Sequence, residues 1–264
     1  QRMYTMTGLG KYQPMGEDCL TLNVVSPRWD GPTPDGEPLP VMFFIHGGGY
    51  ILGSSATPLY DGAALARRGC VYVSVNYRLG PLGCLDLSSL STPDITIESN
   101  LFLRDLVAAL RWVKENIGGF GGDPENVTIF GESAGAHAVA TLLAVPDSKG
   151  LFAQAISESP ASGMVSSPEV AAEFAGRFVD VLGIDRGAAA PALLSADPAD
   201  MVRAMNTVMT KSLDSMMGAA AVGPTHSDDY LPLDPFDAMR KGTAHKVPLI
   251  VGTNAEEGRL FTRF

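Results

Sequence analysis

The chain is poor in cysteine and carries few basic residues. It has three cysteines in 264 residues, namely Cys19, Cys70 and Cys84. An odd and sparse set does not build a disulfide framework, so we expect buried apolar thiols. Lysine and arginine together number 19 against 29 acidic residues, which gives a formal net charge of -10. A nucleic-acid partner needs a basic face, and this composition argues against one.

Long apolar runs are also missing. No stretch reaches the roughly 18 apolar residues of a membrane-spanning helix, and no basic-then-apolar leader opens the chain, which begins with Gln1. We therefore expect a soluble protein and leave open whether it is cytoplasmic or secreted. Hydrophobic residues make up 45% of the chain, enough for one large domain or a large part of one.

Short apolar runs alternate with helical periodicity, a pattern typical of an α/β protein. Continuous apolar runs indicate strands that are buried on both faces, as in a parallel sheet. Strands are predicted over 19–25, 41–45, 71–75, 127–130, 155–157 and 247–251, and helices over 100–117 and 134–144. Region 161–225 differs, with helical patterns at 168–182 and 198–210 and an aperiodic stretch at 211–223. We interpret it as a helical, cap-like insertion in a single domain spanning 1–264.

A candidate nucleophile lies in Gly131-Glu132-Ser133-Ala134-Gly135, which fits G-x-S-x-G. This motif requires a sharp strand-to-helix turn, with a serine hydroxyl exposed and small residues that let strand and helix approach closely. The apolar run 127–130 precedes it and a helix-forming run follows it. An ordinary glycine-rich turn is the alternative in a chain with 29 glycines. The setting favours Ser133 as the nucleophile.

A glycine-rich loop follows the predicted strand 41–45. Its sequence, His46-Gly47-Gly48-Gly49-Tyr50, is of the type that donates backbone N–H groups to an oxyanion. Glycines expose these donors without side-chain cover. With the N–H of Ala134, which follows the nucleophile, Gly48 and Gly49 would provide three donors. A flexible glycine turn is the alternative for this loop taken alone.

Two carboxylates follow the predicted strand 247–251. In the α/β fold that uses a G-x-S-x-G turn, the acid comes after the serine along the chain and the histidine after the acid. Glu257 is our candidate acid, with Glu256 in reserve. Without the other motifs, two solvated surface carboxylates would be the better interpretation.

No histidine is placed to act as the base. The four histidines are His46, His137, His226 and His245, and all of them precede Glu257. His137 lies one helical turn after Ser133, where we expect a packing or helix-surface residue. His226 is expected in a polar loop and His245 in solvent near a helix end. A serine without an imidazole is a weak nucleophile. Either the base lies outside residues 1–264 or the chain is catalytically defective. We favour the first explanation.

Together these motifs resemble the type-B carboxylesterases, a family that includes cholinesterases, para-nitrobenzyl esterases and neuroligins. The matching text is EDCLTLNV at 17–24, HGGGY at 46–50, NYRLGPLG at 76–83, the run 100–135 and GTNAEEG at 252–258. The resemblance implies the α/β-hydrolase fold, with a mostly parallel sheet flanked by helices, and hydrolysis of small-molecule esters through an acyl-enzyme without metal or organic cofactor.

The resemblance also implies roles for particular residues. Ser133 would be the nucleophile and Glu257 the acid, with an oxyanion hole from Gly48, Gly49 and Ala134. Among supporting residues, Glu132 would tune the field beside the nucleophile, Ser157 would lie near the acid, and His46 belongs to the oxyanion loop.

The chain departs from the family in length. Family members are longer and carry the catalytic histidine well after the acid, so we expect this chain to lack parts at both ends. The rest of its own chain, or a second chain, would supply the histidine. Where members have a disulfide at Cys19, the partner would lie upstream, which leaves the redox state of Cys19 open.

Two further expectations follow from the resemblance. A non-catalytic adhesion module of the neuroligin type is the alternative function, and the presence of Ser133, the glycine loop and Glu257 counts against it. Residues 1–264 alone are expected to be unstable or inactive, because a partial sheet exposes a hydrophobic edge.

Overall fold

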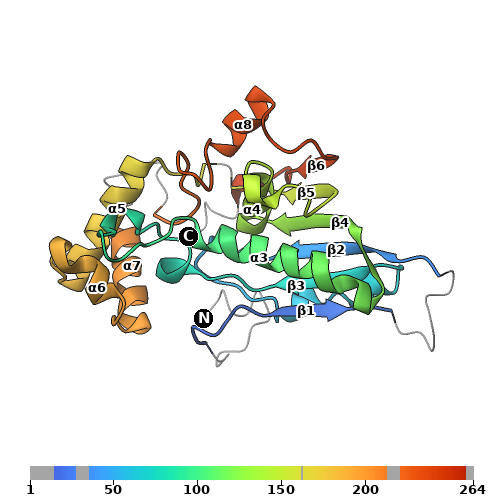
Figure 1. Ribbon diagram of the computed structural model, residues 1–264, viewed down its shortest axis with the longest axis horizontal. Helices are drawn as coiled ribbons and strands as arrows, with labels where there is room; N and C mark the ends of the chain where they lie inside the picture. The colour runs from blue at the N-terminus through green and yellow to red at the C-terminus, as the bar shows by residue number, and fades with distance from the viewer. Residues whose placement is uncertain (1–14, 28–35, 162, 213–220, 260–264) are drawn as a thin grey trace.

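A six-stranded sheet forms the centre of the molecule (Figure 1). The structure is a computed structural model that describes residues 15–27, 36–161, 163–212 and 221–259. The strands are β1 (Leu22–Val25), β2 (Leu39–Ile45), β3 (Val71–Val75), β4 (Gly122–Glu132), β5 (Gln154–Glu158) and β6 (Leu249–Gly252). Their order is β1-β3-β2-β4-β5-β6, and every pair is parallel except β1 with β3. The predicted mostly parallel α/β sheet is confirmed.

The central strands β2 and β3 are covered on both faces. On one face, Val41, Phe43 and Ile45 are fully buried. On the other, the ring of Phe44 packs against those of Tyr60 and Phe130, with centroids 4.8 and 5.1 Å apart. Burial of successive residues explains why these strands are continuous apolar runs rather than alternating ones.

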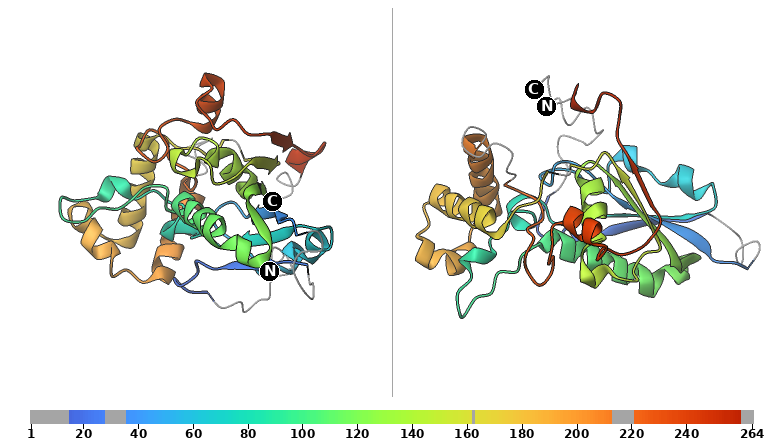
Figure 2. Two further views of the ribbon diagram at one scale, coloured as in Figure 1. Left: turned by 45° about the vertical axis from the view of Figure 1, so that its right-hand side comes forward. Right: turned by 90° about the horizontal axis from the view of Figure 1, so that it is seen from above.

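Helices lie on both sides of the sheet. The long helix α3 (Leu101–Asn116) buries its apolar side chains on one face, and the short α2 (Ala63–Ala66) lies on the opposite face (Figure 2). Helix α4 (Ala134–Leu142) follows β4 directly, and all its residues are buried. The predicted helices 100–117 and 134–144 are confirmed, with ends shifted by one or two residues.

A group of helices lies beyond the carboxyl ends of β2 and β3 (Figure 1). It comprises α5 (Pro168–Leu182), α6 (Ala189–Leu193) and α7 (Pro198–Ser212), and α5 packs against α7. The helical patterns at 168–182 and 198–210 are therefore confirmed, whereas α6 was not predicted. Residues 213–220 of the aperiodic stretch lie outside the described residues. That 161–225 is an insertion within one domain stays a prediction.

Helix α8 (Pro235–Lys241) was also not predicted, although its ends follow ordinary rules. The Asp234 carboxylate accepts hydrogen bonds from the N–H groups of Phe236 and Asp237, and Gly242 ends the helix at a φ of 72°. Side-chain N-caps and left-handed C-terminal glycines are standard helix boundaries. The short length of α8 left too little periodicity to detect.

The last strand corrects one prediction. Run 247–251 indicated a buried strand, but in β6 Leu249, Ile250 and Val251 are 40%, 64% and 57% exposed. Within the described part of the chain β6 ends the sheet and pairs with β5 alone. An apolar run therefore indicates a strand that could be buried on both faces. Whether it is buried depends on the position of the strand in the sheet.

All three cysteines are free thiols, with Cys70 and Cys84 buried and Cys19 partly buried. Burial was expected of all three and is confirmed in full for two. Among the described residues, no helix is both long and apolar enough to cross a membrane.

Candidate active site

Ser133 occupies a strained turn between β4 and α4. Its φ of 58° and ψ of -121° lie outside the regions that non-glycine residues ordinarily adopt. The Ser133 N–H donates to the carbonyl of Glu158 on the neighbouring β5 at 3.0 Å, and its carbonyl accepts from the N–H of His137 at 2.9 Å. This is the sharp strand-to-helix turn that the motif predicts, and it is fixed from both sides.

Two glycines let the end of β2 pass against this turn. A Cβ on Gly131 would lie 2.5 Å from the carbonyl oxygen of Ile45, and a Cβ on Gly135 would lie 2.1 Å from the same oxygen. Neither distance is sterically possible. Both outer glycines of the motif are therefore required by the close approach of β2.

The glycine loop lies directly against the nucleophile. A Cβ on Gly47 would come within 3.2 Å of the Cβ of Ser133 and 2.6 Å of the Glu132 carbonyl. Gly48 and Gly49 have φ values of 117° and 63°, a region that favours glycine. The loop and Ala134, the first residue of α4, thus approach Ser133 from separate elements. Their role as an oxyanion hole stays a prediction.

His46 stabilises the start of this loop from inside. Its Nδ1–H donates to the carbonyl of Gly47 at 2.8 Å, and its ring stacks on Tyr77 with centroids 4.5 Å apart. The Tyr77 hydroxyl in turn donates to the His46 carbonyl at 2.8 Å. Burial lowers the pKa of His46 to about 4, so the imidazole is neutral at pH 7. The Nδ1–H group and the ring face of His46 are thus both engaged in contacts that stabilise the loop.

Glu257 is held by two hydrogen bonds at the carboxyl end of the sheet. Its Oε2 accepts from the Ser159 hydroxyl at 2.8 Å and from the Asn254 N–H at 2.7 Å. The Asn254 bond, followed by that from Ser159, lowers the pKa of this exposed carboxyl. Glu256 instead pairs with Arg259 at 3.3 Å. Of the two candidate acids, Glu257 alone is bonded back to the sheet.

Ser159 contacts the candidate acid, although only Ser157 was expected near it. The Ser157 hydroxyl is buried and donates to the carbonyl of Ala136 at 3.0 Å, which ties β5 to α4. Ser159 follows β5 at a φ of 55° and contacts Glu257. Its place just after a strand, like that of Ser133, was the available signal, because carboxyl ends of parallel strands meet at one edge.

Glu132 lies in a negative environment beside the nucleophile. Partial desolvation, followed by the charges of Glu257 and Glu158, raises the pKa of Glu132. The carboxylates therefore interact electrostatically across the sheet end. Such a field would favour a positively charged group between them.

The histidines are engaged elsewhere. In the described residues, no histidine imidazole hydrogen-bonds the side chain of Ser133 or Glu257. His137 is fully buried and bonded to Tyr50, so of the two roles considered it is a packing residue, not a surface one. His245 lies just after the end of α8, as expected, but it is only partly exposed, and its Nε2 contacts the Val145 carbonyl at 2.8 Å. His226 contacts Ser227 in a loop, as expected.

Metal-ligating side chains do not gather in the described ranges. No group of three His, Cys, Asp or Glu residues there could hold an ion.

Comparison with known proteins gives consistent matches. The sequence profile of the carboxylesterase family matches residues 1–264. The chain is 44% identical over 246 residues to the para-nitrobenzyl esterase of Bacillus subtilis (strain 168), a match covering 93% of this chain and 48% of that protein. It is 40% identical over 247 residues to the fumonisin B1 esterase of Sphingopyxis macrogoltabida, covering 93% and 44% respectively.

The fold gives the same result. A solved structure of a thermophilic PNB esterase superimposes with a TM-score of 0.86 at 40% identity, covering 98% of this chain and 52% of that one. The chain thus spans about half the length of these relatives. The resemblance to type-B carboxylesterases and the α/β-hydrolase architecture are therefore confirmed, and the chain belongs to the carboxylesterase family.

Proposed function

We propose that the protein hydrolyses carboxylic esters through a serine acyl-enzyme. The observation that carries this is Ser133, strained at a φ of 58° with the glycine loop packed against it. Its Oγ attacks the ester carbonyl, and the N–H groups of Gly48, Gly49 and Ala134 stabilise the resulting oxyanion. Donors fixed in advance where charge develops are often the largest contribution to catalysis.

A histidine outside residues 1–264 is part of this proposal. It takes the Ser133 proton, passes it to the leaving alcohol as the ester C–O bond breaks, and is oriented by Glu257. Water then attacks the acyl-enzyme with the same base and releases the carboxylic acid. Support comes from the four histidines of this chain, which are held in other contacts, and from Glu257, which is fixed at the sheet end.

The proposed substrates are small-molecule esters, as the names of the related esterases suggest. None of these steps requires a metal or an organic cofactor. Residues 1–264 on their own lack a base for Ser133 and would be inactive.

Turnover of a para-nitrophenyl ester by the full-length protein tests the proposal. Wild type should turn the ester over and be labelled by a fluorophosphonate, whereas Ser133→Ala should lose at least about 10⁴-fold in kcat and all labelling. Ser195→Ala, an exposed serine on the helical group, serves as the matched control. A wild type without turnover, or turnover that survives Ser133→Ala, would contradict it; a non-catalytic adhesion module would not react.

A further inference from the structure

We propose that the hydrogen bond between Tyr50 and His137 positions the two halves of the oxyanion hole relative to each other. This inference rests on the proposed function. Gly48 and Gly49 belong to the loop after β2, whereas Ala134 belongs to α4. Chain connectivity does not fix one set of donors against the other, because Ala134 comes 85 positions after Gly49 in the sequence.

The Tyr50 hydroxyl bridges these two elements. It lies 3.0 Å from Nδ1 of His137, and both side chains are fully buried. Tyr50 directly follows Gly49, and His137 lies one turn along the helix that Ala134 begins. The bond therefore joins the end of the glycine triplet to the first turn of α4.

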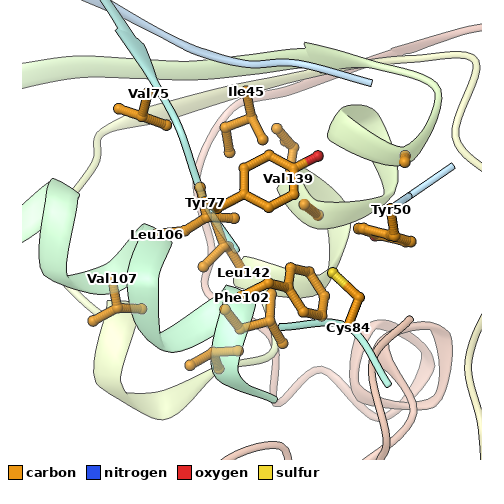
Figure 3. Close-up of a cluster of buried hydrophobic side chains, with 14 of the residues drawn as sticks. Ile45, Tyr50, Val75, Tyr77, Cys84, Phe102, Leu106, Val107, Val139 and Leu142 are labelled. Atoms are coloured by element: carbon orange, nitrogen blue, oxygen red, sulfur yellow. The ribbon is translucent and has the colours of Figure 1, made fainter. Parts of the chain in front are cut away.

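Each partner is itself fixed. Tyr50 has a φ of 64°, its carbonyl accepts from the N–H of Gly80 at 2.8 Å, and its ring packs against Phe102 with centroids 4.8 Å apart. Figure 3 shows Tyr50 and Phe102 in the same buried cluster as Tyr77. The His137 N–H donates to the carbonyl of Ser133. Movement of either ring would therefore be transmitted to a backbone that carries a proposed donor.

Burying the Tyr50–His137 pair costs more free energy than filling the same volume with apolar side chains would. If Tyr50 O–H donates to Nδ1, the His137 Nε2–H is left over, and Nε2 has no hydrogen-bond partner in the described structure. A buried N–H without a partner destabilises the fold, whereas an apolar side chain of similar size would fill the same space without that cost. We therefore infer that the imidazole does more than fill space. Its hydrogen bond to Tyr50, which joins the glycine loop to α4, is the role we assign to it.

A double-mutant cycle in the full-length protein tests this. Tyr50→Phe and His137→Met should each lower kcat about tenfold with KM little changed, since small misplacements of transition-state groups cost rate rather than ground-state binding. Binding of a trifluoromethyl ketone, whose hemiketal oxygen occupies the oxyanion position, should weaken by the same factor. The double variant should lose no more than the worse single variant.

Two controls separate positioning from folding. Active-site titration with a fluorophosphonate counts competent molecules, so partial misfolding does not lower kcat per site. Tyr72→Phe removes another buried phenol bond, to the Tyr60 carbonyl at 2.9 Å, and should leave kcat unchanged. Single variants that match wild type in kcat and ketone affinity, or losses that multiply in the double variant, would overturn the pair's role alone. An inactive wild type would overturn the proposed function as well.

Discussion

The Ser159 hydroxyl donates a 2.8 Å hydrogen bond to Oε2 of Glu257 and so ties the end of β5 to the segment after β6. These residues are far apart in the chain but follow adjacent parallel strands, and the Ser159 N–H also donates to the carbonyl of Gly252 at 2.7 Å. The candidate acid is thereby held at the same carboxyl end of the sheet as Ser133, although it is exposed. Its position depends on neighbouring strands rather than on burial.

The two neighbouring glutamates should behave differently on substitution. Glu257→Gln in the full-length enzyme removes the charge that would orient the histidine, so kcat should fall by about 10³-fold or more. Glu256→Gln, which breaks only an exposed contact to Arg259, should change kcat less than about twofold. Steady-state kinetics on a para-nitrophenyl ester measures both. Equal losses in the two variants would count against Glu257 as the acid.

A methyl group on Gly135 should disrupt the turn at Ser133. Gly135→Ala places a Cβ 2.1 Å from the backbone oxygen of Ile45, and we expect a loss of at least about 3 kcal/mol in unfolding free energy. The control is Gly118→Ala, where a Cβ meets nothing within 4 Å and the stability should change little. Urea denaturation of both variants measures this. A fully stable Gly135→Ala protein would show that β2 does not approach the turn this closely.

Stability should fall in mild acid because of His137. Burial lowers its pKa from 6.5 to about 4, so the unfolded chain takes up the proton first as pH falls. The contribution of the neutral His137 imidazole to the free energy of unfolding is complete above pH 6.5 and declines toward pH 4. About 2 kcal/mol of it is lost by pH 5. Urea unfolding of the full-length protein at pH 7.5 and 5 should show this loss reduced by about 2 kcal/mol in His137→Met. An unchanged pH dependence would contradict the neutral, buried imidazole.

The exposed strand β6 should make residues 1–264 self-associate. Leu249, Ile250 and Val251 present apolar side chains on the last strand of the described sheet, and such edges pair with other chains. Ile250→Lys should lower the apparent mass in light scattering at equal concentration. Leu194→Lys, at an apolar site beside the helical group that is 76% exposed against 64% for Ile250, should not. A monodisperse wild-type monomer would refute this prediction.

The sequence by itself determined the longer helices, the strand runs and the local motif, but not the short helices α6 and α8. Strand β3 coincides with its apolar run, and α3 follows from its three- and four-residue spacing, because both depend on neighbours along the chain. The turn at Ser133 is equally local, since its outer glycines, the preceding strand and the following helix are consecutive. The carboxylesterase family could be recognised for the same reason.

Only the tertiary structure decided which distant residues meet. Sheet order places β6 at the edge and leaves an apolar run exposed, and the same order brings Ser159, rather than Ser157, to Glu257. The contact between Tyr50 and His137 spans 87 residues. Such pairings are set by how strands and helices pack in three dimensions, and no periodicity within either segment records its partner.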